Sequence, residues 1–177
     1  MPVKALGLSE FATRLPGAFF GILSIIAIFL LTNSIFQNRK IALLSSFLLA
    51  ISPWHIVLSR ASAETIVALF FILLGFALIL ISLQKKNNYY LLVGLISLIV
   101  SFFFYHTPRV FVPILLLVLG FISYSQISKN RKFTKKFILS IFLVGAISFL
   151  LVFSAKGGTG RFTQVNIFGS PATKLVM

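Results

Sequence analysis

The sequence predicts an all-α membrane protein, a polytopic bundle of about six transmembrane helices. Apolar residues make up 59% of the 177 positions and charged residues only 10%, which lies outside the range of soluble globular domains. The mean hydropathy of +1.08 agrees with that composition. The apolar runs are also long and continuous, whereas the strands of a membrane barrel alternate apolar with polar residues.

The N-terminal region predicts a short interfacial helix followed by the first span. Ser9 can cap a helix that begins at Glu10, and Pro16 is expected to end this helix because the residue before a proline avoids the helical conformation. The first span then covers 16–36, roughly 20 residues, which is long enough to cross the hydrocarbon core. We expect this span to stay in the protein, because it is too long for a signal peptide and no cleavage site follows it.

The second and third spans meet at a polar junction. The second span covers 41–58, and Pro53 near its far end is expected to kink it or stop it early. The third span covers 61–83 and carries Glu64 close to its start. Three further spans cover 89–105, the stretch from a hinge at 106–109 to about 124, and, after a basic loop at 126–136, residues 137–153.

The last apolar run ends at about Ser154. We therefore expect a membrane domain over 1–154 and an extracytoplasmic tail over 155–177 that leads to a missing C-terminal part.

The charges of the connections predict the orientation of this bundle. Connections of a six-span chain alternate between the two membrane faces, and positive charge in short loops marks the cytoplasmic side. The loops after the first, third and fifth predicted spans contain no acid and no histidine. Their basic residues are Arg39, Lys40, Lys85, Lys86, Lys129, Arg131, Lys132, Lys135 and Lys136. We expect a multi-pass protein of the plasma (inner) membrane whose acidic and histidine-bearing junctions are extracytoplasmic.

These extracytoplasmic junctions form the candidate site. The only two carboxylates of the chain each have an arginine four residues away, so on a helix each acid would share a face with its base. Ionisable groups near membrane depth are costly and usually face a protein or water cavity. The candidates for binding substrate and its phosphate are Glu10, Arg14, His55, Arg60, Glu64, His106 and Arg109.

Simpler explanations exist for the same residues. The acid–arginine pairs also fit helix-end ion pairs, and the histidines fit interfacial side chains that extend to water. No spacing matches a zinc motif, so we assign no metal ligand and leave the cofactor open, a divalent cation included. The basic residues are scattered between apolar runs, which argues against nucleic acid as a partner. Without cysteine, the chain has no disulfide and no thiolate metal site.

Three segments resemble a known family. They are GLSEFATRLPGA at 7–18, LAISPWHIVLSRASAE at 49–64 and YHTPR at 105–109. In order and spacing they are similar to span junctions of the membrane glycosyltransferases of the dolichyl-phosphate-mannose protein mannosyltransferase and aminoarabinose transferase type (glycosyltransferase family 39), over about 7–153. The resemblance implies a GT-C fold in which a sugar passes from a polyprenyl-phosphate carrier to an extracytoplasmic acceptor. It also implies that basic side chains hold the carrier phosphate and that an acid acts as base or orients other groups.

One departure from this family concerns catalysis. The resemblance implies a principal catalytic aspartate on a segment that would lie upstream of Met1, and both acids of this chain are glutamates. We therefore expect a truncated fragment of such a transferase, with lipid and a lipid-phosphate-linked sugar as partners, no catalytic residue of its own and no turnover in isolation. Two other classes stay open, a transporter or channel subunit with Arg60 and Glu64 as a gating pair, and a non-catalytic structural membrane protein.

Overall fold

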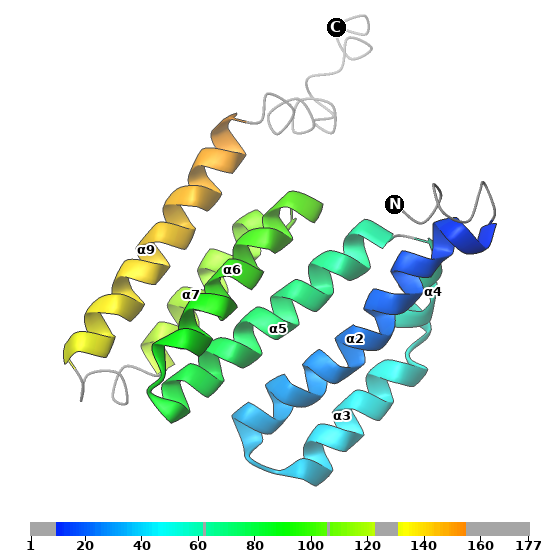
Figure 1. Cartoon of the computed structure of the whole chain (residues 1–177), viewed down its shortest axis with the longest axis horizontal. Helices are drawn as coiled ribbons and strands as arrows, with labels where there is room; N and C mark the ends of the chain where they lie inside the picture. The colour runs from blue at the N-terminus through cyan, green and yellow to red at the C-terminus, as the bar shows by residue number, and fades with distance from the viewer. Residues whose placement is uncertain (1–9, 62, 106, 123–130, 155–177) are drawn as a thin grey trace, which may run out of the picture.

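The structure, a computed structural model, describes residues 10–61, 63–105, 107–122 and 131–154. All regular structure in this part of the chain is α-helical, which confirms the predicted all-α class. The helices are α2 (Glu10–Phe36), α3 (Arg39–Ile51), α4 (Pro53–Ala61), α5 (Ala63–Lys85), α6 (Asn88–Phe104), α7 (Thr107–Ile122) and α9 (Arg131–Ser154) (Figure 1).

The long helices run alternately up and down, and α5 lies in the middle of the arrangement (Figure 1). On one side α5 packs against α2, which in turn contacts α3 and α4. On the other side α5 packs against α6, and α7 and α9 pack on each other and on α6.

Two of the described helices have both the length and the composition of a membrane span, Arg14–Phe36 and Glu64–Lys85. The pair α3 and α4 passes the same test only when taken together, and its axis bends by 58° at Ser52. This break confirms the predicted interruption before Pro53. The segments Asn88–Phe104, Thr107–Phe121 and Phe137–Leu150 are apolar but shorter.

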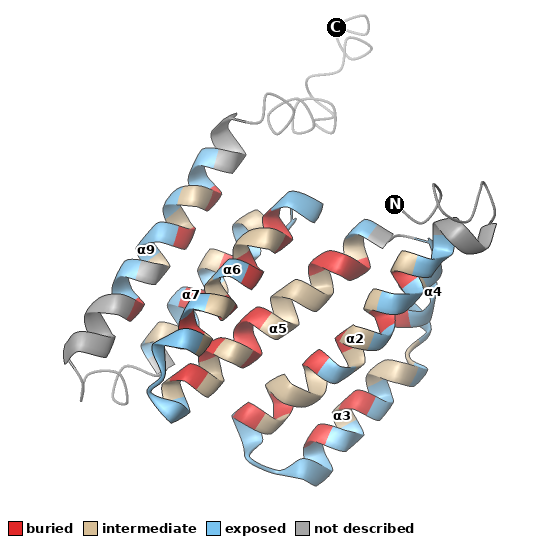
Figure 2. Ribbon diagram, viewed as in Figure 1, coloured by how far each residue is buried: buried red, intermediate tan, exposed pale blue. Residues whose placement is uncertain are grey.

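Many residues on the outer faces of the helices are exposed (Figure 2), and large apolar residues are numerous among them. Examples are Leu43 on α3 at 61% exposure, Phe121 on α7 at 86% and Phe142 on α9 at 75%. Apolar side chains this exposed are costly in water but suit contact with lipid, so the described surface is that of a membrane domain.

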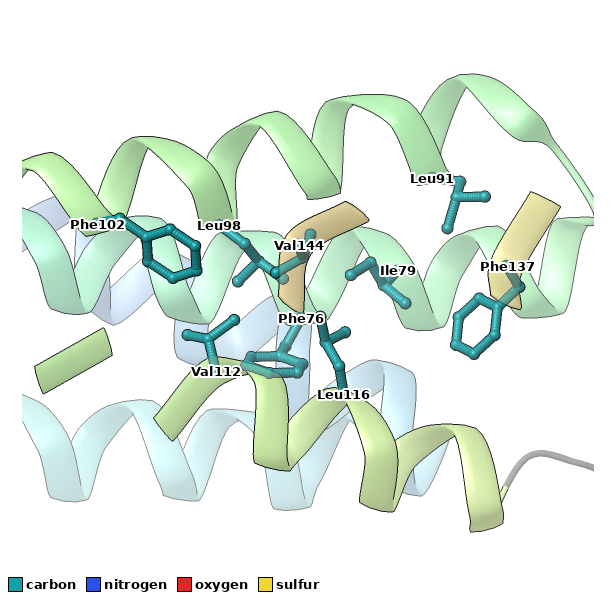
Figure 3. Close-up of a cluster of buried hydrophobic side chains, with 9 residues drawn as sticks. All are labelled: Phe76, Ile79, Leu91, Leu98, Phe102, Val112, Leu116, Phe137 and Val144. Atoms are coloured by element: carbon teal, nitrogen blue, oxygen red, sulfur yellow. The ribbon is translucent and has the colours of Figure 1, made fainter. Parts of the chain in front are cut away.

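The largest buried cluster joins four helices (Figure 3). Phe76 and Ile79 of α5, Leu98 and Phe102 of α6, and Val112 of α7 belong to it, and α9 adds further members. Small residues allow α5 and α6 to approach closely within this region. A Cβ added at Gly75 would lie 2.6 Å from Leu98 Cδ2, and one at Gly94 would lie 2.9 Å from the Gly75 carbonyl oxygen. Close backbone approach at small residues is typical of helix packing in membranes.

The predicted boundaries of α2 and α9 were wrong. Helix α2 does not end before Pro16 but continues through it as one helix from Glu10. The proline removes a single hydrogen bond near the start of the helix, where neighbours or water can satisfy the freed carbonyl. Similarly, α9 begins at Arg131, inside the predicted loop 126–136, because lysine and arginine have high helix propensity and extend the helix beyond its apolar run.

The α2–α3 and α5–α6 turns have the same construction. Each helix is followed by one residue in the left-handed region, Gln37 with φ 53° or Lys86 with φ 51°. An asparagine N-cap comes next in both turns: Asn38 Oδ1 accepts from the Lys40 amide and Asn87 Oδ1 from the Tyr89 amide, each at 2.9 Å. Two residues therefore suffice to reverse the chain at both places.

Candidate functional site

The helix ends that carry the predicted site residues lie at one end of the bundle. The start of α2, the α4–α5 junction and the α6–α7 junction are at this end, and the α2–α3 and α5–α6 turns are at the other (Figure 1). We call the first the junction end and the second the turn end.

His55 occupies the contact between α4 and α2. Its side chain is buried, and Nε2 lies 2.7 Å from the Ser24 hydroxyl oxygen. That hydroxyl donates to the Gly21 carbonyl at 2.7 Å. Ser24, His55 and the Gly21 carbonyl thus form one hydrogen-bonded group between the two helices. The alternative that His55 is an interfacial side chain extending to water was wrong, because α4 folds back over α2 and encloses the ring.

Gly21 makes this contact possible. A Cβ at this position would lie 2.9 Å from the Ser59 Cβ, one turn beyond His55 on α4. The two helices thus touch at their backbones, and the contact fixes the position of α4 and of Arg60 in its last turn. Sequence reasoning did not single out Gly21 or Ser24; the small residues Gly17, Gly21 and Ser24, spaced for one helix face, were the available signal.

Arg60 and Glu64 lie on different helices. Arg60 is in the last turn of α4 and Glu64 in the first turn of α5, so the prediction that they share one helix face was wrong. Both side chains are exposed, and no ion pair joins them in the described part of the chain. Each charge has the sign that its own helix end favours, since the helix dipole attracts cations at the C-terminus and anions at the N-terminus.

Arg109 connects three helices at the α6–α7 junction. It lies in the first turn of α7, and its Nε donates to the Phe102 carbonyl in the last turn of α6 at 3.1 Å. A cation at this position complements the dipole at the C-terminal end of α6 and satisfies one of the carbonyls in its last turn. The backbone carbonyl of Arg109 in turn accepts from the Ser148 hydroxyl of α9. The predicted hinge at 106–109 was placed too late in the chain: α7 already begins at Thr107, and the extended residue that follows α6 is Tyr105.

The remaining candidates are only partly described. Arg14 is exposed on α2, and Glu10 lies four residues before it on the same helix, as predicted. The side chain of Glu10 and the whole of His106 lie outside the described residues, as does the tail at 155–177.

The described residues do not test the expectation of a catalytic aspartate. It was predicted upstream of Met1, and the described part of the chain begins only at Glu10. Its position therefore stays a prediction. Among the described residues, no group of three or more His, Cys, Asp or Glu side chains is arranged to hold a metal ion.

Apolar helices of span length, a broken helix pair and charged residues at both ends of the bundle define a multi-pass helical membrane protein. The family model for dolichyl-phosphate-mannose-protein mannosyltransferases matches residues 3–156. The chain therefore belongs to this family of membrane glycosyltransferases, and the predicted family resemblance is confirmed. No curated protein and no solved structure gives a significant match.

Proposed function

We propose that this chain serves the transfer of a sugar from a polyprenyl-phosphate carrier to an acceptor on the extracytoplasmic face, within a GT-C type membrane domain. The family match over residues 3–156 carries this proposal. It is supported by the position of Arg14, Arg60 and Arg109, which belong to helix ends at the same end of the bundle.

The chemistry of the donor explains why these arginines matter. When the sugar leaves, negative charge develops on the carrier phosphate, and fixed cations in a water-poor site stabilise that charge. A guanidinium binds phosphate oxygens in a bidentate manner, which also fixes the orientation of the donor. Arg60 is exposed and its helix is held against α2 through Gly21, so it is our first choice for this role, with Arg14 on the neighbouring helix as a second cation.

Glu64 is the described carboxylate nearest to this region in the chain. It is exposed in the first turn of α5, four residues after Arg60. We assign it to orienting the acceptor or the donor-binding arginines. Arg109 already donates to the Phe102 carbonyl, so we give it a positioning role at the α6–α7 junction beside any contact with the donor.

We further place the junction end on the extracytoplasmic side of the plasma (inner) membrane. The basic residues of the α2–α3 and α5–α6 turns and of the α9 start support this placement, because short loops rich in lysine and arginine stay in the cytoplasm.

A donor-binding measurement tests the proposal without requiring turnover. The chain in detergent micelles is titrated with polyprenyl-phosphate mannose, and the Kd is compared between wild type and Arg60→Ala. We expect Arg60→Ala to weaken binding about 10- to 100-fold, as the loss of a charge-assisted hydrogen bond worth about 1.5–3 kcal/mol implies.

Arg131→Ala is the matched control. It removes the same type of side chain from the start of α9, at the opposite end of the bundle. This variant should bind the donor like wild type. An equal loss in both variants, or no measurable binding by the wild-type chain, would contradict the proposal.

A further inference from the structure

An apolar groove of about 890 Å³ lies between α2, α5 and α7. On α5 it reaches from Leu69 to Gln84. At the rise of an α-helix this is about 22 Å, longer than the ~15 Å that one leaflet contributes to the hydrocarbon core. The groove is therefore long enough for an acyl chain lying along the helices.

The groove is polar at one end only. Its polar lining consists of Ser34, Gln37 and Gln84, and all other lining side chains are apolar. Gln84 Nε2 and Gln37 Nε2 both donate to the Ser34 carbonyl, at 2.6 Å and 3.1 Å. Gln37 of the α2–α3 turn and Gln84 in the last turn of α5 thus converge on one carbonyl in the last turn of α2, and they set the polar limit of the groove at the turn end.

Exposed cations adjoin this polar limit. In sequence Gln37 is followed by Asn-Arg-Lys, and Gln84 by Lys-Lys-Asn, and all four basic side chains are exposed. Lys85 Nζ also lies over the Tyr90 ring, 5.2 Å from its centroid. The two acids of the chain, Glu10 and Glu64, belong to the first turns of α2 and α5, at the opposite ends of the helices that form the groove. The turn end therefore has positive charge, with no acidic residue to balance it, beside the apolar groove.

We propose that this groove binds an anionic phospholipid of the bilayer, with an acyl chain along α2, α5 and α7 and the headgroup phosphate beside Lys85 and Lys86. Charge selects the occupant: the apolar walls accept any acyl chain, but four cations without an acid favour a headgroup with net negative charge over a zwitterionic one. This site is separate from the proposed donor site, because its polar lining lies at the turn end and it uses none of the same side chains.

The test compares lipid retention by the purified 177-residue chain in mild detergent, measured by native mass spectrometry. Phosphatidylglycerol and phosphatidylcholine with identical acyl chains are the probes. We expect wild type to retain phosphatidylglycerol in preference to phosphatidylcholine. The double variant Lys85→Gln/Lys86→Gln should lose about fivefold in phosphatidylglycerol affinity for each lysine removed, with phosphatidylcholine unchanged.

A second variant tests the groove itself. Leu73→Trp adds bulk within the groove and should reduce retention of both lipids, whereas Leu92→Trp, at an exposed position of α6, should not. Circular dichroism shows whether each variant is folded. Both lysines are exposed, so their substitution should not disturb folding, and the lysine variant tests the proposal even if Leu73→Trp does not fold. The proposal would be overturned if wild type retained the two lipids equally or if the lysine variant kept its phosphatidylglycerol affinity. It would also be overturned if wild type formed a dimer that Leu73→Trp dissociates, because a second copy of the chain would then occupy the groove.

Discussion

His55 illustrates how a residue that looks functional in the sequence can serve the fold. It is one of only two histidines, lies next to the single tryptophan, and belongs to the segment that resembles the family. In the structure its ring is enclosed between α4 and α2 and forms a hydrogen bond with the Ser24 hydroxyl. This contact orients α4. It therefore affects the candidate site only indirectly, by positioning Arg60 in the last turn of α4.

A double-mutant cycle measures this contact. Ser24→Ala, His55→Ala and the double variant are unfolded by denaturant in micelles, and the coupling free energy is calculated. We expect about 0.6 kcal/mol and at most about 1.7 kcal/mol, the range of interhelical hydrogen bonds in membrane proteins. Additive effects of the two substitutions would show that the hydrogen bond does not contribute.

Gly21 allows a sharper comparison. Gly21→Ala would place its Cβ 2.9 Å from the Ser59 Cβ, whereas a Cβ at Gly145 of α9 meets nothing within 4 Å. Both substitutions gain the same helix propensity, so their difference isolates the α2–α4 contact. We expect Gly21→Ala to be less stable than Gly145→Ala by about 1–3 kcal/mol in the free energy of unfolding, the usual cost of overpacking. Equal stabilities would mean that α4 is not held tightly against α2.

At the scale of single elements, the two short turns stabilise the bundle through their asparagine caps. Asn38→Ala and Asn87→Ala should each lower the free energy of unfolding by about 0.5–2 kcal/mol, because each removes an N-cap hydrogen bond. Asn88→Ala is the control, since Asn88 is the first residue of α6 and lies beyond the cap. Thermal unfolding in one detergent compares the three variants, and a loss in Asn88→Ala equal to that in Asn87→Ala would contradict the capping role.

The helices themselves were largely predictable from the sequence, because a continuous apolar run of span length has few alternatives to a membrane helix. The break at Ser52 was also predictable, since Pro53 cannot continue the hydrogen bonding of the helix before it. Helix ends were harder. Pro16 is tolerated inside α2, and Arg131 begins α9 inside a segment that reads as a polar loop.

The candidate site was less predictable than the helices, because its geometry depends on contacts between distant segments. The spacing of Arg60 and Glu64 predicted one helix face, but the structure places them on α4 and α5, which are separate helices. The hydrogen bond from His55 to Ser24 spans 31 residues and has no local signal. Arg109 Nε donates a hydrogen bond to the Phe102 carbonyl, and this interaction requires α7 to fold against the end of α6.

At the scale of the whole molecule, the charges divide the bundle into two ends with different chemistry. Both acids belong to helix starts at the junction end, whereas the charged residues described at the turn end are all basic. The proposed donor site lies at the first end and the proposed phospholipid site at the second. An orientation with the turn end in the cytoplasm gives each its own side of the membrane.

Cysteine labelling in intact cells tests this orientation. The chain has no native cysteine, so single substitutions give no background. Arg60 and Lys86 are both exposed and belong to opposite ends of the bundle. We expect Arg60→Cys to react with a membrane-impermeant maleimide in intact cells, and Lys86→Cys to react only after permeabilisation. The reverse pattern would invert the orientation.

The most direct test of the donor site is photocrosslinking with a photoreactive polyprenyl-phosphate sugar, followed by peptide mapping. We expect crosslinks in α4 and the first turn of α5, around Arg60 and Glu64, and we expect excess phosphatidylglycerol not to prevent them. Crosslinks confined to the α2–α3 and α5–α6 turns, or lost when phosphatidylglycerol is added, would show that the carrier phosphate binds at the turn end and would contradict the assignment of the donor site.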